Sequence, residues 1–261
     1  MKKMAKVLGL VLAATCVLGS MAACDFSGIF KNKEEKVLKI GFTYYAPMNY
    51  IDEETNEFVG FDTEFATKVC EELGYEAEFV EIDWNKKVID LQAGTIDCIW
   101  NGMTITEELQ ESILISDAYM ENKQVVVVRT EDADKYSTVA DLANATSIAY
   151  ENGGAAAGLI EGDERLSAVT KNAVTKQADT LLEVKTGATD VAVIDYTMAK
   201  TMTGEGTDYA DLTYIVVDFP VEQYGIGFRK TDTELCTQIN ELIAQYESDG
   251  TFDAWITKYF N

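Results

Sequence analysis

The sequence contains no histidine, only two prolines among 261 residues, and few basic side chains. Without histidine there is no histidine general base, no Ser/His or Cys/His catalytic pair and no histidine-ligated zinc. Twenty-one Lys and Arg against 45 Asp and Glu give a formal net charge of −24, which argues against nucleic acid as a partner. Two prolines exclude a proline-rich tail or stiff linker. The remaining composition, 47% hydrophobic and 25% charged, is that of a folded chain with one large or two medium domains.

The chain begins with a segment typical of a secretory signal. A basic start precedes the apolar run Val7–Leu18, which is too short to span a bilayer comfortably. Small residues then lead to Met21-Ala22-Ala23-Cys24, which is similar to a bacterial lipobox, where the cysteine becomes the lipidated first residue. We therefore expect a signal peptide over 1–23, a lipid anchor on Cys24 and a tether over 24–36. The alternative is a plain secreted protein whose Cys24 pairs elsewhere.

Three cysteines remain beyond Cys24: Cys70, Cys98 and Cys236. Their number is odd and their spacing is not that of metal ligands. Cys70 and Cys98 lie among apolar residues, so we expect buried thiols and no disulfide framework. The sequence predicts no metal site and no cofactor.

Strand and helix patterns alternate through the body of the chain. Leu38, Ile40 and Phe42 alternate with other residues as in a strand, and apolar residues then recur at helical spacing up to Gly74. A second strand over 76–82 and a second helix over 84–93 follow the same order. Such alternation predicts parallel strands covered by helices, the α/β class.

One segment of the chain is similar to another. In 93–101 and in 186–194, a helix ends at a glycine, an aspartate follows three residues later, and a short apolar strand comes next. This predicts two similar lobes, with Asn101-Gly102 and Ile194-Asp195 at equivalent strand ends. Ligands of open parallel sheets bind beyond the carboxyl ends of the strands, so two facing lobes would form a cleft. Chance similarity is the alternative, because helix–Gly–strand connections are common.

Two extended segments are suited to cross between the lobes. Gln124–Arg129 is a run rich in β-branched residues, and Glu222–Arg229 contains two glycines that ease the backbone. Two such crossings are what a hinge between lobes needs.

Together these residues resemble a known family, the bacterial extracytoplasmic solute-binding proteins of amino-acid ABC importers (family 3, the polar amino-acid binding lipoproteins). The similarity covers about residue 37 to the end. Its markers are Tyr45-Ala46-Pro47, Val59-Gly60-Phe61-Asp62, Asn101-Gly102-Met103-Thr104-Ile105-Thr106, the two crossings, and Asp249-Gly250-Thr251-Phe252. The resemblance implies a two-lobed periplasmic-binding-protein-like fold of type II, with two hinge strands and an interlobe ligand cleft. Lobe 1 would comprise 37–126 and 225–261, and lobe 2 would comprise 127–224.

The resemblance also implies a set of ligand-binding residues. Tyr45 and Trp84 would sandwich the ligand, Gly102 and Thr104 would bind its head group, and Asp195 would pair with an α-ammonium. The full set is Tyr45, Trp84, Asn101, Gly102, Thr104, Gly154, Ala155 and Asp195. A core role for Trp84 and a plain helix N-cap role for Asp195 are the alternatives. The loop 151–155 would open a helix whose backbone N–H groups suit a carboxylate.

Leu109 is the largest departure from the family pattern, which places there an arginine that clamps the ligand carboxylate. The chain has three arginines, none an evident replacement, and Lys123 is the nearest candidate cation. Phe42 stands where members that bind cationic side chains often carry an acid. Basic amino acids are therefore expected to be disfavoured, and a neutral amino acid or an amine without the carboxylate fits better.

The sequence thus predicts binding without catalysis. A lipid-anchored extracytoplasmic protein, monomeric, would capture a small polar solute (an amino acid or related amine) and deliver it to an ABC permease in the membrane. It would lie on the periplasmic face or on the outer face of a single-membrane bacterium. An enzyme of the same fold, similar to cyclohexadienyl dehydratase, is the alternative, but no motif positions an acid–base pair. A third hypothesis is that the chain is a detached sensory domain.

Overall fold

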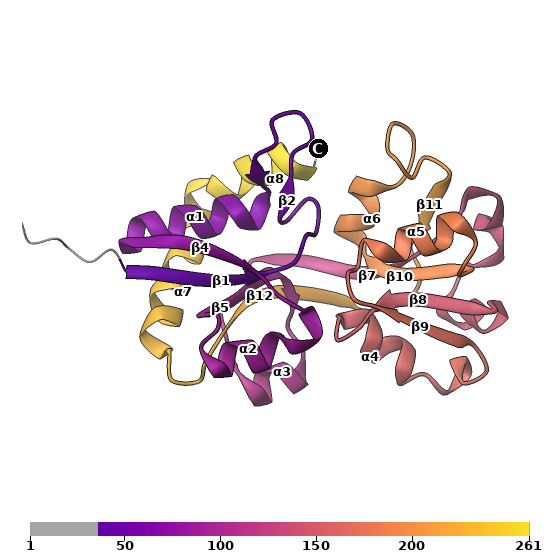
Figure 1. The fold of residues 1–261 in the computed structure, drawn as a ribbon, viewed down its shortest axis with the longest axis horizontal. Coiled ribbons are helices and arrows are strands. Elements are labelled where there is room, and N and C mark those ends of the chain that lie inside the picture. Colours follow the sequence, from indigo (N-terminus) through magenta and orange to yellow (C-terminus); the bar gives the residue numbers. More distant parts are fainter. Residues whose placement is uncertain (1–35, 261) are drawn as a thin grey trace, which may run out of the picture. The chain divides into compact units, whose positions relative to one another are not determined.

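A computed structural model describes residues 36–260, which form two α/β lobes (Figure 1). The predicted signal peptide, the Cys24 anchor and the tether up to residue 35 lie outside the described residues. The strands are β1 Lys36–Phe42, β2 Tyr50–Ile51, β3 Phe58–Val59, β4 Tyr75–Glu81, β5 Cys98–Thr104, β6 Leu114–Ile115, β7 Met120–Arg129, β8 Ser147–Glu151, β9 Thr170–Val174, β10 Val191–Asp195, β11 Leu212–Ile215 and β12 Val221–Phe228. The α-helices are α1 Phe61–Leu73, α2 Lys87–Ala93, α3 Glu107–Ser112, α4 Ala155–Glu161, α5 Asp179–Thr186, α6 Tyr196–Met202, α7 Thr233–Asp249 and α8 Thr251–Phe260. Short 3-10 helices span Trp84–Lys86, Thr130–Lys135, Val139–Asn144 and Glu164–Leu166.

One sheet runs through both lobes in the order β4-β1-β5-β12-β7-β10-β8-β9. The first part of β7 pairs with β12 at residues 120–123, and its second part pairs with β10 at 124–127. Conversely, β12 leaves β7 at Tyr224 and continues beside β5. Each of these two antiparallel strands therefore exchanges its partner part-way along, which carries the chain from one lobe to the other (Figure 1). The exact residue bounds of the two lobes stay a prediction.

The predicted elements of the first lobe are present. The alternating segment forms β1, the helical pattern forms α1, and Gly74 ends that helix in the left-handed conformation at φ 74°. The second predicted strand is β4, shifted by one residue. The second predicted helix divides into a 3-10 turn that begins at Trp84 and the helix α2.

The two segments that are similar in sequence are built alike. Arg229 donates hydrogen bonds to the carbonyls of Leu91 and Ile96, next to its ion pair with Asp97. Arg129 donates in the same way to the carbonyls of Val184 and Thr189, which stand 93 positions later. It also lies 3.8 Å from Asp190, the equivalent of Asp97. In each lobe, one arginine thus ties the end of a helix to the start of the next strand.

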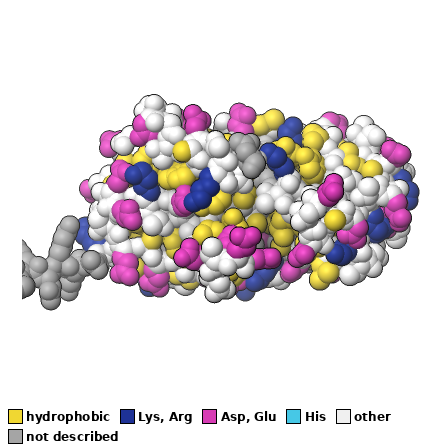
Figure 2. All heavy atoms as spheres, turned by 90° about the horizontal axis from the view of Figure 1, so that it is seen from above, with side chains coloured by type: hydrophobic (Ala, Val, Ile, Leu, Met, Phe, Trp, Pro, Cys, Tyr) yellow, Lys and Arg dark blue, Asp and Glu magenta, His cyan; other side chains and the backbone are white. Residues whose placement is uncertain are grey.

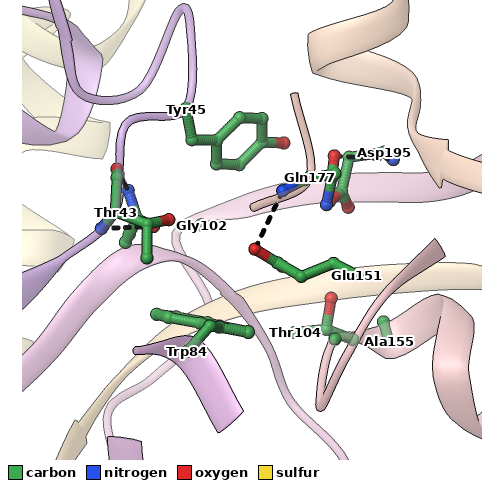
Figure 3. A pocket seen from close by; sticks show the side chains of 11 residues that line it. Thr43, Tyr45, Trp84, Gly102, Thr104, Glu151, Ala155, Gln177 and Asp195 are labelled. Carbon is green, nitrogen blue, oxygen red and sulfur yellow. Dashed lines mark hydrogen bonds between the residues drawn. The ribbon is translucent and has the colours of Figure 1, made fainter. Parts of the chain in front are cut away.

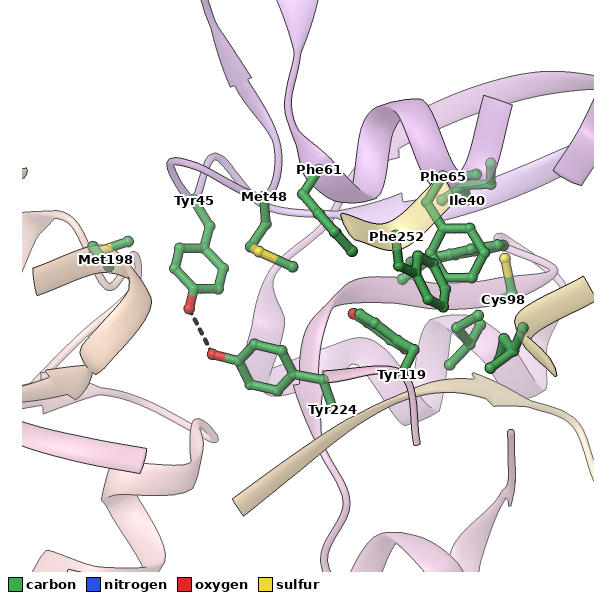
Figure 4. Packing of buried hydrophobic residues seen from close by; sticks show 14 of the residues in the cluster. Ile40, Tyr45, Met48, Phe61, Phe65, Cys98, Tyr119, Met198, Tyr224 and Phe252 are labelled. Carbon is green, nitrogen blue, oxygen red and sulfur yellow. Dashed lines mark hydrogen bonds between the residues drawn. The ribbon is translucent and has the colours of Figure 1, made fainter. Parts of the chain in front are cut away.

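Both faces of the sheet are buried, as expected for strands covered by helices on each side. In β7, Val125 and Val127 face one core while Val126 and Val128 face another. In lobe 1, α1, α7 and α8 pack an aromatic-rich core against one face, with Phe65 and Phe252 at its centre (Figure 4). Helix α2 covers the opposite face through a small cluster around Leu91 and Ile99. The helices therefore hold the strand ends in fixed positions.

Cys70, Cys98 and Cys236 are free and buried, which confirms the expectation of buried thiols at Cys70 and Cys98. Acidic side chains are scattered over the face seen in Figure 2, with lysines and arginines between them. Within residues 36–260, no helix is long and apolar enough to cross a lipid bilayer.

Candidate functional site

One cavity collects all eight residues that the sequence predicted as ligand contacts (Figure 3). It has about 340 Å³ of non-atom space, a figure that includes space open to solvent, and about 20 Å³ of it has room for the centre of a water molecule. Lobe 1 lines it with Thr43, Tyr45, Trp84, Asn101, Gly102 and Thr104, and lobe 2 with Glu151, Gly154, Ala155, Gln177 and Asp195. Contact of the eight with a ligand stays a prediction.

Asn101 fixes the loop that follows β1. Its Oδ1 accepts hydrogen bonds from the backbone N–H and the hydroxyl of Thr43, at 3.1 and 2.7 Å. Its Nδ2 donates to the Thr43 carbonyl at 2.9 Å and to Oδ1 of Asn49 at 2.6 Å. The amide is fully occupied by these bonds, so Asn101 shapes the wall of the cavity.

Gly102 is held by the first residues of α1. Buried Asp62 accepts a hydrogen bond from the Gly102 N–H at 2.7 Å and one from the Tyr119 hydroxyl at 3.0 Å. Gly102 adopts φ +55°, and a Cβ there would stand 2.8 Å from Cε1 of Tyr45. The glycine therefore lets the Tyr45 ring lie directly against the backbone of β5.

Tyr45 links lobe 1 to the hinge and to lobe 2. Its hydroxyl is hydrogen-bonded to the Tyr224 hydroxyl at 2.7 Å (Figure 4) and to the Thr197 hydroxyl. Burial, together with the charge of Asp195, raises the pKa of both tyrosines well above the ordinary value. Both phenols therefore stay protonated and act as neutral hydrogen-bonding groups.

Asp195 ends β10 and occupies the N-cap position of α6, but its side chain makes no capping hydrogen bond. Its Oδ1 accepts from the Tyr224 hydroxyl at 2.9 Å, from Gln124 at 3.0 Å and from Asn122. Its Oδ2 accepts from Nε2 of Gln177 at 2.5 Å. Burial raises the pKa of Asp195, and these four donors oppose that shift. The side chain faces the cavity, so a plain N-cap role does not account for it.

Glu151 is a second carboxylate in the cavity. It is the last residue of β8, its side chain is buried, and its Oε1 accepts from the backbone N–H of Gln177 at 3.1 Å. Burial raises the pKa of Glu151 to about 8, with Asp195 acting in the same direction and Lys87 against it. Gln177 therefore contacts both acids, one through its backbone and one through its side chain.

Trp84 forms one wall of the cavity and supports Lys87. The Lys87 Nζ lies 4.9 Å from the centre of the Trp84 ring and donates to the Gly153 carbonyl of lobe 2 at 2.7 Å. Burial lowers the pKa of Lys87 to about 8. Lys87 is therefore the cation beside the cavity. Lys123, the candidate from the sequence, lies half-buried on β7, outside the cavity lining.

Comparison with known proteins decides the family. The family model of the bacterial extracellular solute-binding proteins, family 3, matches residues 38–261, nearly the whole body of the chain. The chain belongs to this family. The solute-binding protein thus has the two-lobed fold of its structural relatives, and the resemblance inferred from its sequence is confirmed.

The relatives of this solute-binding protein bind amino acids. It is 26% identical to the arginine-binding extracellular protein of Bacillus subtilis, over 96% of each chain. Among solved structures, an ancestral arginine-binding protein bound to arginine matches with a TM-score of 0.79 at 28% identity, over 87% of this chain and 99% of that one. An ancestral amino acid-binding protein, a precursor of cyclohexadienyl dehydratase, matches with a TM-score of 0.77 at 30% identity, over 86% and 96%.

Among the described residues 36–260, no arginine lines the cavity. Leu109, at the position of the expected arginine, packs against the cluster of Trp84, Met103 and their neighbours at the mouth of the cleft. Arg129 and Arg229 are bound at the helix ends described above, and Arg165 pairs with Asp163. Lys87 is a basic side chain that lines the outer mouth of the cleft.

Three lining residues escaped the sequence analysis: Thr43, Glu151 and Gln177. Glu151 carried a usable signal, because it is an acid at the carboxyl end of an apolar parallel strand, as Asp195 is. Thr43 follows β1 in the same way. Gln177 lies in a loop between β9 and α5, and no local pattern distinguishes it.

Proposed function

We propose that this solute-binding protein captures an amino acid or related amine between its lobes and delivers it to an ABC permease. The observation that supports the proposal is a cavity to which both lobes contribute, since ligand contacts from both sides favour closure over the ligand. Tyr45 and Trp84 supply aromatic faces, and Asp195 supplies the anionic partner for an ammonium.

Calorimetry on Asp195→Asn tests this proposal. Asparagine keeps an acceptor for the three donors on Oδ1, from Tyr224, Gln124 and Asn122, and changes only the acceptor that faces Gln177, whereas alanine would leave all four donors unpaired and would confuse binding with folding. A thermal-shift screen of amino acids and amines first identifies a ligand, because binding raises the apparent stability. We expect the substitution to weaken the binding of that ligand by about tenfold or more, while the melting temperature of the ligand-free variant changes little. Unchanged affinity would remove Asp195 from the site.

Delivery and anchoring form the second part of the proposal. The lipobox-like residues before Cys24 support a lipid anchor that keeps the protein beside its permease. Cys24→Ala should release the protein from the membrane fraction into the medium or periplasm and reduce uptake of the labelled ligand by whole cells. Retention of the variant in the membrane fraction would contradict the anchor.

Two observations keep the enzymatic alternative open. A buried acid with a pKa near neutrality, Glu151, lies in the cleft, and one structural relative is a precursor of cyclohexadienyl dehydratase. Incubating the purified protein with a cyclohexadienyl acid and assaying the dehydrated product separates the two functions. Turnover abolished by Glu151→Gln would favour the enzyme, and the absence of product favours the binding protein.

A further inference from the structure

The charges that line the cavity do not balance. Among its eleven lining residues are two carboxylates, Glu151 and Asp195, and no lysine or arginine. Their exposed fractions are only 5% and 6%. A third acid, Glu222, shares the amide of Gln124 with Asp195, since that amide donates to both at 3.0 Å. Buried carboxylates require a partner of opposite charge or must take up a proton.

Lys87 offsets this excess only in part. Its Nζ donates to two backbone carbonyls, those of Gly153 at 2.7 Å and Trp84 at 3.3 Å, and not to an acid. It lines the outer mouth of the cleft and not the cavity itself. One lysine outside the cavity therefore stands against three carboxylates in or beside it.

Each of the two lining acids keeps a free position that faces the cavity. Oε2 of Glu151 has no hydrogen-bond partner within residues 36–260, and the carboxylate points into the cavity between Trp84 and Gln177 (Figure 3). Oδ1 of Asp195 is saturated by three donors, but Oδ2 accepts only from Gln177 and has a further lone pair. The cavity thus offers two separate carboxyl groups with acceptor positions open to a ligand, both fixed by Gln177.

We propose that the ligand carries two cationic nitrogen groups, one bound by Asp195 and the other by Glu151. This inference rests on the proposed function and narrows it to the ligand class of diamino acids and diamines. A zwitterion without a second cation would satisfy Asp195 and leave Glu151 either unpaired or protonated. A dication offers a cationic partner to both acids.

The position of Phe42 in the structure does not disfavour cationic ligands. Phe42 packs with Phe58 and Phe79, at ring-centroid distances of 4.8 and 6.0 Å, and does not line the cavity. The residue at this position therefore says nothing about the ligand. The acid that selects for a cation is supplied by β8 of lobe 2 instead.

Calorimetry with four ligands of one chain length tests the proposal. Lysine and cadaverine carry two ammonium groups, with and without a carboxylate, and norleucine and pentylamine are the counterparts with one. We expect the second ammonium to increase affinity by about tenfold or more in both pairs. The arginine and agmatine pair extends the test to a guanidinium group. The ratio of lysine to cadaverine then shows whether the ligand is an amino acid or an amine.

Glu151→Gln assigns the effect to one side chain. The variant keeps the shape of the residue, so the advantage of the second ammonium should fall to less than about threefold while the affinity for norleucine or pentylamine stays the same. Glu241→Gln is the matched control, because Glu241 is an exposed acid on α7 that does not line the cavity. It should leave all four affinities unchanged.

The outcomes separate this inference from the proposed function. Tight binding of norleucine or another neutral amino acid, with no gain from a second ammonium, would overturn the inference and leave the proposed function standing. The inference would also be overturned, and the proposed function left standing, if the Glu151→Gln variant still binds ligands with two ammonium groups as much more tightly than ligands with one as the unchanged protein does. Circular dichroism checks that this variant is folded. If no amino acid and no amine binds, the proposed function itself fails.

Discussion

The carboxylate of Asp62 accepts a hydrogen bond from the backbone N–H of Gly102 at 2.7 Å, although the two residues are 40 positions apart. Asp62 lies at the start of α1, and Gly102 lies in β5 against the ring of Tyr45. The bond therefore connects the first helix of lobe 1 to the wall of the ligand cavity. It explains why an acid tolerates complete burial there, although burial raises its pKa to about 7.

Asp62→Ala should destabilise the protein and weaken ligand binding together. The change leaves two buried donors without an acceptor, the Gly102 N–H and the Tyr119 hydroxyl, which costs about 2–4 kcal/mol of unfolding free energy. Tyr119→Phe removes only one donor and should cost about 1 kcal/mol with little effect on affinity. Urea denaturation and calorimetry measure both, and equal losses for the two variants would refute the link to Gly102.

Gly102→Ala should harm binding far more than Gly94→Ala. Both glycines have positive φ, +55° and +75°, so alanine at either costs about 1–2 kcal/mol of backbone strain. At Gly102 the new methyl group would also stand 2.8 Å from Tyr45 and 3.2 Å from Tyr224, whereas at Gly94 it meets nothing within 4 Å. We expect Gly102→Ala to cost at least about 1 kcal/mol more in urea denaturation and to weaken ligand binding. Similar losses for the two variants would show that only backbone strain matters.

The ligand-free protein should become less stable as the pH rises from about 5 to about 8. Burial raises the pKa of Asp62 to about 7, of Glu222 to about 7 and of Glu151 to about 8. The unfolded chain releases these protons near pH 4, so in this window the folded state binds more protons and its unfolding free energy falls.

Urea denaturation at intervals of one pH unit measures this slope. Glu151 is faced by Asp195 and Asp179, which raise its pKa, and by Lys87, which lowers it. Glu151→Gln should flatten the slope, and Glu241→Gln, which removes an exposed acid on α7, should not. Stability that rises between pH 5 and pH 8 would show that these acids are ionised in the folded protein.

Arg129→Met and Arg229→Met should reduce stability and leave the affinity for the ligand unchanged. Each arginine binds two carbonyls at a helix end and one or two aspartates, so each loss costs about 1–3 kcal/mol. Arg165→Met is the control, because its pair with Asp163 is exposed and should contribute less than about 1 kcal/mol. Weaker ligand binding in any of the three variants would mean that an arginine contributes to the site after all.

Much of the fold could be predicted from local patterns. Alternation defined β1, helical spacing defined α1, and a glycine marked the end of that helix, because these features depend on neighbours within a few residues. The similarity of 93–101 to 186–194 correctly indicated equivalent units, each tied by one arginine. The rule that ligands lie at the carboxyl ends of parallel strands led to Gly102 and Asp195, which both line the cavity.

The electrostatic balance of the site could not be predicted in this way. Gln177 comes from a loop without a motif, yet it contacts both Glu151 and Asp195. Lys87 resembles any helix lysine in the sequence, and its place beside the cavity depends on the Gly153 carbonyl, 66 residues away. Which residues become such partners depends on how the lobes pack and not on the spacing of residues along the chain.

By itself the sequence determined the α/β class, the pair of similar lobes and the residues at the strand ends, since periodicity and turn chemistry act over short distances. Only the tertiary structure decided which charges meet in the cleft, because burial and pairing depend on side chains brought together from distant segments. The sequence alone places Leu109 where the family pattern has an arginine. That the cleft instead holds two acids with free acceptor positions, Glu151 and Asp195, depends on strands that only the fold brings side by side.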